Sequence, residues 1–465
     1  MPPRPDGPFR YGPITLRRSD STVYPFGGKE ERAVNIYPLD HIVNTARRAS
    51  PFYARLYRDL PAKGWSLEQL PVIDQKEFWE ANTSGNNRLL TGPMDSGIVF
   101  KSGGTTGNPK FSLFTPEEWQ TFTELFGRGL AANGMKSGDR VANIFYAGEL
   151  YASFLFITFS LHNCPAGALQ FPIAGGTAVD EIVHFIREYD IDVIAGVPTS
   201  ILGVGEYLAS HNEAPPAIRK ILFGGESMYP DQRQFLQRVI PGVKITSIGY
   251  ASVDAGHLGF ADEGCAHDEH RVFGEASVLE ILDEDTGEVI RKPGRPGKVF
   301  ITNLTRLLMP IVRYPAGDRA MWVEPETCPN RKFRLLGRSD EAARIGPMTL
   351  YLKDIRDILG HFWETLGVVN FQMSIEHREK KDFLVLRIVS SLPKASLQSS
   401  SEGIIAEICR QRPMYQELLA CDKIDPIVID WIDEKDLIIN PRTGKLRAVI
   451  DNRMHCVEKS ATDQL

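Results

Sequence analysis

The sequence lacks the features that mark membrane, nucleic-acid-binding and disulfide-stabilised proteins. Its longest apolar passage, residues 150–161, is shorter than the roughly 20 residues that span a bilayer. It has 53 Lys and Arg against 59 Asp and Glu, so no overall positive charge attracts nucleic acid or an anionic membrane. Six cysteines occur without a CxxC pair, which argues against a disulfide scaffold. No apolar signal segment is visible near the start, and we expect a cytoplasmic protein.

Length and patterning predict a multidomain α/β protein. At 465 residues, 42% of them hydrophobic, the chain is long enough for more than one core. The first 35 residues are rich in Pro, Gly and Arg and indicate an extended arm. Residues 39–60 show helical spacing interrupted by Pro51, which predicts two short helices. Between residues 139 and 196 apolar strand-like runs alternate with helical stretches, as in parallel βαβ units.

The C-terminal part has a different pattern. Residues 277–290 predict a β-hairpin with its turn at 283–287. Beyond residue 340 we expect a helix over 352–361, a second hairpin within 370–390, one amphipathic helix over 402–419 and a final strand at 426–432. The predicted organisation is therefore an arm (1–35), a large multi-sheet body with parallel βαβ units (36–339) and a small α+β cap domain (340–465).

A Gly-rich segment, FKSGGTTGNPK at residues 100–110, follows a short predicted strand. Its glycines permit turns that leave several backbone N–H groups facing one way, and Ser102, Thr105 and Thr106 add hydroxyl donors, a combination that suits a phosphate. Pro109 argues against a P-loop NTPase, because it would obstruct the helix that follows such a loop. An ordinary Gly-rich turn is the alternative for this segment taken alone.

Five further segments follow in a fixed order: FGGES (223–227), GYASVD (249–254), RYPAGD (313–318), GRSDE (337–341) and PRTGK (441–445). With this ordered set the sequence resembles the adenylate-forming superfamily of acyl-CoA synthetases, peptide-synthetase adenylation domains and luciferases. The phenylacetate-CoA ligase branch, which includes adenylating proteins of phenazine biosynthesis, is the most similar. That likeness rests on SPFYARLY, LEQLPVIDQKEF, FYAGELYASF and INPRTGKLRAVIDNR, and runs from about residue 38 to 453.

The resemblance implies two half-reactions. ATP and a carboxylate give an acyl-adenylate and pyrophosphate, and then a nucleophile, usually the CoA thiol, displaces AMP. An attack on an anionic α-phosphate needs concentrated positive charge, and Lys445 is the residue expected to supply it. Tyr250 would stack on adenine, Asp318 would bind the ribose hydroxyls, and Asp340 would be the hinge of the cap. The nucleotide-binding residues implied are Ser102, Gly104, Thr105, Thr106, Gly107, Lys110, Gly225, Glu226, Tyr250, Ala251, Asp318 and Arg338.

The sequence contains two candidate metal sites, one for Mg²⁺ and one for zinc. Asp254 stands where the family usually has Glu and is expected to hold Mg²⁺, although its side chain is shorter. Val253 replaces the usual Thr. Zinc is conceivable at Cys265, His267 and His270, since some members of the branch carry Cys/His zinc sites here. However, Asn330 replaces a ligand of the branch, and a polar surface loop is the alternative.

The acid should bind among the aromatic residues of the FYAGELYASF segment. The expected contacts, which together favour a planar ring acid, are Phe145, Tyr146, Tyr151, Phe154 and Gly249. The prediction is an AMP-forming ligase that uses Mg-ATP, an aromatic carboxylic acid and CoA. An amine, a carrier protein or a reductase as acceptor in secondary metabolism stays open, as does a non-catalytic nucleotide-binding relative, because Gly103, Val253 and Asp254 depart from the usual motif. A monomer and a homodimer are both compatible with the sequence.

Overall fold

The part of the chain that the structure describes excludes several predicted segments. The computed structural model covers residues 34–101, 110–211, 215–228, 230–338, 342–345, 348–378, 381–397, 400–421, 423–440 and 444–452. The predicted N-terminal arm therefore lies almost wholly outside the described residues. So do most of the Gly-rich segment, at 102–109, and the predicted hinge Asp340.

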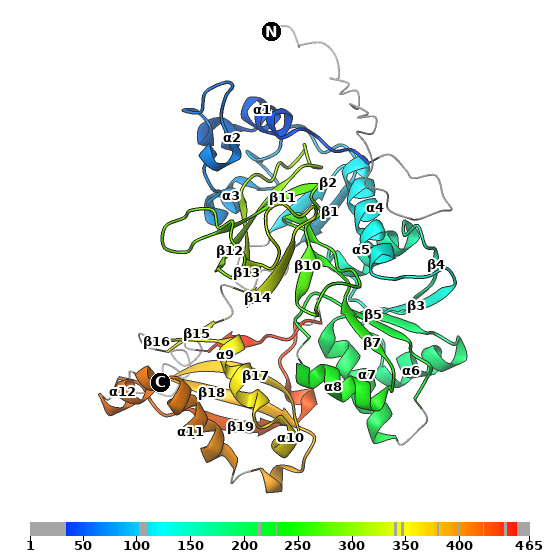
Figure 1. The fold of residues 1–465 in the computed structure, drawn as a ribbon, viewed down its shortest axis with the longest axis vertical. Coiled ribbons are helices and arrows are strands. Elements are labelled where there is room, and N and C mark those ends of the chain that lie inside the picture. The colour runs from blue at the N-terminus through cyan, green and yellow to red at the C-terminus, as the bar shows by residue number, and fades with distance from the viewer. Residues whose placement is uncertain are drawn as a thin grey trace, which may run out of the picture.

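The first unit of the body is an antiparallel five-stranded sheet packed against N-terminal helices (Figure 1). The prediction of two helices around Pro51 is confirmed, because the Ser50 side chain caps the second helix and Pro51 is its first residue. The strand order is β10-β14-β13-β12-β11. The bounds are α1 (Leu39–Ala49), α2 (Pro51–Leu56), η1 (Leu67–Gln69), α3 (Gln75–Ala81), β10 (Glu269–Arg271), β11 (Ser277–Leu282), β12 (Pro296–Asn303), β13 (Tyr314–Trp322) and β14 (Lys332–Arg338).

The second unit contains the predicted parallel sheet, which is confirmed with strand order β4-β3-β5-β6-β7. Strands β5 and β6 are buried at every residue, as expected for a sheet that helices cover on both faces. The bounds are α4 (Pro116–Ala132), β3 (Asp139–Asn143), α5 (Ser153–His162), β4 (Ala168–Pro172), α6 (Val179–Glu188), β5 (Val193–Gly196), α7 (Pro198–Ser210), β6 (Lys220–Phe223), α8 (Pro230–Val239) and β7 (Lys244–Ser247).

Two short hairpins adjoin the parallel sheet: one precedes its strands in the chain and the other follows them. Strand β1 (Ile98–Lys101) pairs with β2 (Phe111–Phe114), so the two flanks of the Gly-rich segment meet where Lys101 pairs with Phe111. Strand β8 (Tyr250–Ser252) pairs with β9 (Gly256–Gly259). Both hairpins bring motif residues next to the parallel sheet.

The cap is an α+β unit with its own core around a sheet of order β19-β18-β17-β20. It lies beside the parallel-sheet unit and below the antiparallel sheet in Figure 1. The bounds are β15 (Ala342–Ile345), β16 (Met348–Tyr351), α9 (Leu352–Gly360), α10 (Trp363–Leu366), β17 (Val368–Arg378), β18 (Lys381–Ser390), η2 (Lys394–Ser396), α11 (Ser401–Gln411), α12 (Pro413–Ala420), β19 (Val428–Ile432), η4 (Glu434–Asp436) and β20 (Val449–Asp451).

One predicted element of the cap is wrong. The single helix expected over 402–419 is two helices, and α12 starts at Pro413. Proline has no N–H to donate and its ring clashes with the preceding turn, so Pro413 begins a new helix instead of continuing α11. The other elements predicted for the cap, including the 370–390 hairpin, are present.

The boundary between body and cap stays a prediction, because residues 339–341 are outside the described chain. On one side β14 ends at Arg338 within the antiparallel sheet. On the other side Ala343 and Ile345 already belong to the core of the cap.

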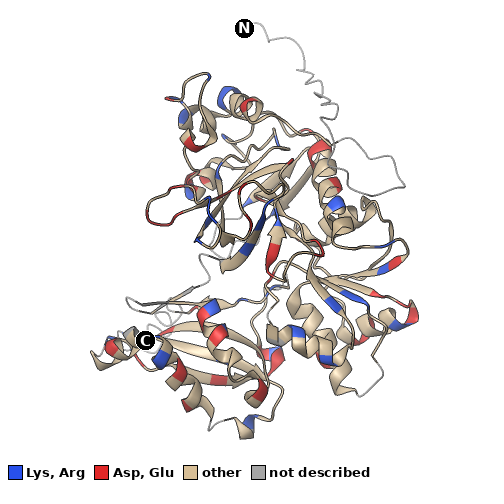
Figure 2. Cartoon of the chain, in the orientation of Figure 1, with Lys and Arg blue, Asp and Glu red and all other residues tan. Residues whose placement is uncertain are grey.

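Charged residues of both signs are distributed over the described part of the molecule. Figure 2 shows Lys and Arg interspersed with Asp and Glu over body and cap. Within the described residues, no helix is long and apolar enough to cross a membrane.

Candidate active site

The candidate site lies at the carboxyl edge of the parallel sheet. Strand β6 leads directly into Gly224 and Gly225, β7 leads to Gly249 and Tyr250, and β3 leads to the aromatic loop at 144–152. Parallel strands all end at the same edge, so these three loops converge there. This convergence is the fold's contribution to the site.

Tyr250 and Asp318 are in direct contact. The Tyr250 hydroxyl donates a hydrogen bond to Asp318 Oδ2, although the two residues are 68 positions apart. Behind the tyrosine, its ring centroid lies 5.9 Å from that of His270 and 6.1 Å from that of Phe333. The structure therefore brings the predicted adenine-binding and ribose-binding side chains together. Arg338 faces Asp318 in the strand register, and its side chain is outside what the structure describes.

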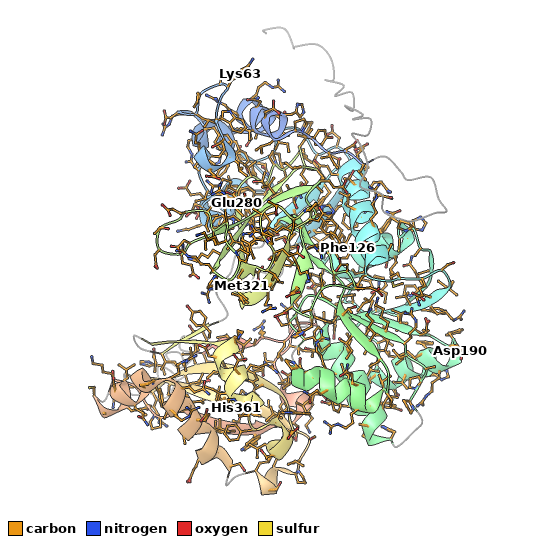
Figure 3. The ribbon with its side chains drawn as sticks, viewed as in Figure 1. Lys63, Phe126, Asp190, Glu280, Met321 and His361 are labelled. Carbon is orange, nitrogen blue, oxygen red and sulfur yellow. The ribbon has the colours of Figure 1, made fainter. Side chains whose placement is uncertain are left out.

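The turn before Tyr250 depends on a glycine and a buried polar pair. Gly249 has a φ of +131°, and a Cβ there would lie 2.8 Å from the ring of Phe126, which Figure 3 labels. The Ser247 hydroxyl accepts a hydrogen bond from the Gly249 N–H at 3.2 Å and lies 2.8 Å from His270 Nε2. Gly249, predicted to contact the acid, lies against Phe126 and forms the turn that leads to Tyr250.

Asp254 lies next to the β1–β2 hairpin, where Ser112 donates to its carboxylate at 3.4 Å. Its backbone is fixed by Arg306, which is 1% exposed. The Arg306 guanidinium donates to the carbonyls of Val253, Asp254 and Leu113 at 3.3, 3.2 and 2.7 Å. Sequence reasoning missed Arg306, because no local pattern indicates that an arginine satisfies carbonyls from two distant segments.

Of the residues in the Gly-rich segment that are predicted to bind the nucleotide, only Lys110 is among the described residues. Its ammonium lies 5.6 Å from the centre of the Trp79 ring, a cation–π contact. The other predicted residues of the segment, Ser102, Gly104, Thr105, Thr106 and Gly107, lie outside the described residues.

The aromatic loop after β3 borders the same edge. Phe145 and Tyr151 are buried, whereas Tyr146 and Phe154 are half-buried, as is Ala251 on β8. Glu149 and Leu150 have positive φ values of 46° and 62°, which is unusual for residues with a Cβ. Such backbone conformations cluster at functional sites, in agreement with the role predicted for this loop.

The cap places Lys445 at this edge. A Cβ built on Gly225 would lie 3.0 Å from Lys445 Cε and 3.4 Å from Nζ, so the lysine side chain packs directly on the glycine. A Cβ on Gly444 would overlap the Tyr146 ring. Only a glycine at 444 permits this approach of the lysine turn to the aromatic loop.

Glu226 joins the two domains at the same point. Its carboxylate accepts hydrogen bonds from the N–H and hydroxyl of Thr199, at 3.1 and 2.8 Å, and from the N–H of Leu446. Burial raises the pKa of Glu226, and the hydrogen bonds from Thr199 and Leu446 and the charge of Lys445 oppose that rise. Glu226, predicted to bind nucleotide, thus contacts the lysine turn in this structure.

A second contact between body and cap involves two acids. The carboxyl of Glu206 on α7 faces that of Glu434 in the cap. Burial, followed by the proximity of Glu434, raises the pKa of Glu206 to about 9. Nearby, Arg238 lies 5.5 Å from the Trp363 ring. These two residues help to line a cavity of about 370 Å³ between α7, α8 and the cap.

The candidate zinc residues do not converge. The described residues contain no group of three His, Cys, Asp or Glu side chains arranged to hold a metal. His270 is buried, and its Nε2 lies 2.8 Å from the Ser247 hydroxyl.

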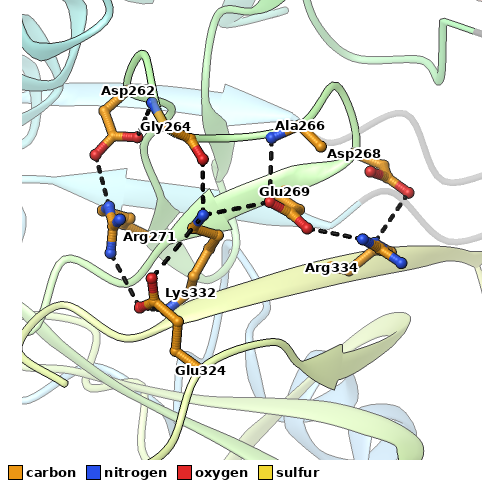
Figure 4. Close-up of polar contacts among 9 residues, drawn as sticks. All are labelled: Asp262, Gly264, Ala266, Asp268, Glu269, Arg271, Glu324, Lys332 and Arg334. Atoms are coloured by element: carbon orange, nitrogen blue, oxygen red, sulfur yellow. Dashed lines mark hydrogen bonds and ion pairs between the residues drawn. The ribbon is translucent and has the colours of Figure 1, made fainter. Parts of the chain in front are cut away.

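A network of ion pairs holds the segment that contains Cys265, His267 and His270 (Figure 4). Arg271 contacts Asp262 at 2.6 Å and Glu324 at 3.1 Å. On the neighbouring strand, Arg334 contacts Glu269 at 2.8 Å. Lys332 donates to the carbonyl of Gly264 at 2.7 Å. Sequence reasoning missed this network because its partners come from three separate segments.

Comparison with known proteins agrees with this geometry. A family model described as "AMP-binding enzyme" matches residues 61–305, more than half of the chain. The phenylacetate-coenzyme A ligase of Thermus thermophilus is 26% identical over 78% of this chain and 82% of its own length. The indoleacetate–lysine synthetase of Pseudomonas savastanoi is 23% identical over 87% of this chain and 97% of its own length.

Among solved structures, a 2-hydroxyisobutyryl-CoA ligase in complex with its acyl-AMP has a TM-score of 0.72, with 19% identity over 92% of this chain and 90% of that chain. The α/β fold predicted from the ordered motifs is that of adenylate-forming ligases and is confirmed. The chain therefore belongs to the AMP-binding enzyme family, as an AMP-forming acid ligase of its phenylacetate-CoA ligase-like branch.

Proposed function

We propose that this ligase activates an aromatic carboxylic acid with Mg-ATP and transfers the acyl group to CoA. The observation that carries the proposal is the position of Lys445, which packs on Gly225 at the sheet edge where Tyr250 contacts Asp318. A cation from the cap and a candidate nucleoside site from the body would thus serve the same reaction. The name of the Thermus relative supports phenylacetate-like acids and CoA.

In the adenylation step, Tyr250 and Asp318 would bind adenine and ribose and so fix the α-phosphate near Lys445. The lysine ammonium would neutralise charge that develops as the acid carboxylate attacks that phosphate and pyrophosphate leaves. Closure of the cap would exclude water, which would otherwise hydrolyse the adenylate. In the second step the CoA thiolate would attack the acyl carbon and release AMP.

Asp254 fits the chemistry of a magnesium ligand. It offers a carboxylate on a backbone that the buried Arg306 fixes, and Mg²⁺ commonly takes one or two protein carboxylates together with phosphate oxygens. Bound there, Mg²⁺ would offset the negative charge of the phosphates. The polar partner of Asp254 on β2, Ser112, would orient its carboxylate.

The aromatic loop supports an aromatic acid. Phe145 and Tyr151 are buried beside the half-buried Tyr146, which also contacts the lysine turn. A planar ring would stack on such a surface. A pocket that selects its substrate by shape needs no cation, which only a substrate with a second carboxylate would require.

An amine is the second candidate acceptor. The observation in its favour is the indoleacetate–lysine synthetase, of which the match covers 97%. That protein's name specifies an aromatic acid and an amino acid amine. The adenylation step proposed here is the same for both acceptors.

The proposal is tested by pyrophosphate exchange over a panel of aromatic and aliphatic acids, followed by mass spectrometry of the products formed with CoA, lysine or a carrier protein. We expect exchange with aryl acids and an acyl-CoA product. Exchange that requires a short aliphatic acid would overturn the aromatic assignment, and an acyl-lysine product would favour the amine. ATP binding without exchange on any acid would indicate a non-catalytic relative.

The contact between Glu206 and Glu434 predicts a pH dependence. Burial, followed by the proximity of Glu434, raises the pKa of Glu206 to about 9 in the docked arrangement. Glu206 therefore keeps a proton there that an ordinary carboxyl has lost above about pH 4.5. Docking should therefore weaken as pH rises between these values, by at most about 1.4 kcal/mol per pH unit. In Glu206→Gln this proton uptake is absent, so the ratio of variant to wild-type exchange rate should rise from pH 6 to pH 9.

Measuring that ratio cancels the other titrations of the enzyme. The control is Glu181→Gln, which changes the same charge at an exposed position of α6. A Glu206→Gln ratio that stays as constant with pH as that of the control would contradict the prediction.

A further inference from the structure

Glu226 is placed to connect the body with the lysine turn of the cap. It follows β6 after Gly224 and Gly225, and the φ of +82° at Gly225 turns the chain so that Glu226 points at the cap. The residue is half-buried, and its carboxyl group is enclosed where the two domains meet. Burying a carboxylate is costly unless hydrogen bonds satisfy it.

The two oxygens of Glu226 bind different domains. Oε2 accepts both hydrogen bonds from Thr199, which lies in the first turn of α7, where backbone N–H groups have no partner within the helix. Oε1 accepts from the N–H of Leu446 in the cap. The body therefore orients the carboxylate with one oxygen and presents the other to the cap.

Leu446 directly follows Lys445, so this hydrogen bond fixes the backbone next to the lysine. The turn is held internally as well, because Asn440 donates to the Lys445 carbonyl and Gly444 donates to the Asn440 carbonyl, both at 2.8 Å. A lysine side chain has a long flexible stem, and its ammonium reaches a defined place only when its backbone is set. Hydrogen bonds to Lys445 O and Leu446 N–H therefore fix the backbone on both sides of the peptide bond that follows the lysine.

We propose that Glu226 is a positioning residue for adenylate formation, which docks the Lys445 turn on the body through the Leu446 N–H. The role rests on the proposed function, since it concerns the step that uses Lys445. The Glu226 carboxylate undergoes no covalent change in this role. Its Oε1 accepts one hydrogen bond when the cap docks and is exposed when the cap departs. Its partners on α7 remain in both arrangements.

The proposal predicts unequal effects on the two half-reactions. Losing a hydrogen bond to a charged acceptor and leaving its partners unpaired should lower pyrophosphate exchange in Glu226→Ala by about 10- to 100-fold. Attack of CoA on a supplied acyl-adenylate does not use Lys445, and its rate should fall at least about tenfold less. Glu226→Gln, which keeps one acceptor oxygen, should lie between Glu226→Ala and the wild type.

A measurement that needs no substrate comes first: hydrogen–deuterium exchange of the full-length protein. In Glu226→Ala, the amides of a peptide spanning 444–448 should exchange deuterium faster, while peptides that cover the strands β5, β6 and β7 keep their protection. Thr199→Val removes only the hydroxyl that orients Oε2, and should give a smaller change in the same peptide.

The outcomes separate this role from others. Unchanged exchange at 444–448 in Glu226→Ala overturns the docking role, whatever the enzyme's substrate is. Both half-reactions are measured with phenylacetate and phenylacetyl-adenylate, or with the best acid of the panel. If deuterium exchange at 444–448 is faster but both half-reactions lose the same factor in rate, Glu226 has a general structural role and the positioning role is overturned. If no acid supports pyrophosphate exchange, the proposed function fails, and the deuterium result alone decides whether Glu226 docks the turn.

Discussion

Replacing Lys445 by alanine should lower pyrophosphate exchange by about 100- to 1000-fold, with little change in ATP affinity. The lysine packs on Gly225 beside the edge where Tyr250 and Asp318 would hold the nucleoside. Charge that is aimed at a developing transition state contributes to the rate more than to ground-state binding. Exchange rates and the ATP dissociation constant, measured by calorimetry, give the two quantities.

Two control variants make this result specific. Lys445→Arg keeps the charge but changes its geometry, and should recover only part of the activity. Lys435→Ala removes a charge from an exposed position of the same domain and should leave exchange unchanged. A loss of ATP affinity as large as the loss of rate in Lys445→Ala would contradict the assigned role, because it would indicate uniform binding of the ground state.

Replacing Glu280 by alanine should destabilise the body by about 3–5 kcal/mol. Glu280 lies in the antiparallel sheet (Figure 3) and forms two 3.0 Å contacts with Arg313, and both side chains are 6% exposed. The alanine variant would leave the Arg313 guanidinium buried and without a counter-charge from Glu280, although it would still donate to the carbonyls of Glu68 and Leu70. An uncompensated buried charge is far more costly than a missing surface pair.

Thermal and urea unfolding followed by circular dichroism measure this effect. The matched control is Glu284→Ala, which removes the partner of Arg319 from a 2.7 Å ion pair whose side chains are 34% and 30% exposed. That pair should contribute about 0–1 kcal/mol. If the Glu280 and Glu284 variants unfold at the same temperature and urea concentration, the buried pair does not have the predicted importance.

The position of Arg313 links this stability to the candidate site. Arg313 has a φ of +48° and directly precedes β13, the strand that carries Asp318. A residue with a Cβ in this conformation must be held by its surroundings, and the contacts with Glu280 do so. Destabilising the pair should therefore also loosen the start of the strand that presents Asp318.

The fold was predictable where local pattern decides it. The alternating apolar and helical runs between 139 and 196 correctly indicated the parallel sheet, because buried parallel strands need continuous apolar residues. The single helix at 402–419 was wrong although Pro413 was visible. The apolar spacing indicates one continuous helix there, whereas the missing N–H of Pro413 makes it the start of a second helix.

The resemblance names candidate site residues one by one, and their roles stay predictions, but it does not indicate which side chains contact one another. Neither the Tyr250–Asp318 bond nor the Glu226–Leu446 bond has a local signal, since the partners are 68 and 220 positions apart. Arg306 was missed for the same reason: its three carbonyl partners belong to two segments of the chain that only the fold brings together.

The contact between Tyr146 and Gly444 has a consequence for how such an enzyme can change its substrate. Tyr146 belongs to the loop proposed to hold the acid, and its ring also forms the surface on which the lysine turn rests. A substitution at 146 that changes the shape of the acid pocket would also change the surface that the cap contacts. A substitution of Tyr146 would then change substrate selectivity and catalytic rate together. Substitutions of Phe154 or Tyr151 should therefore change the preferred acid with less loss of rate than substitutions of Tyr146.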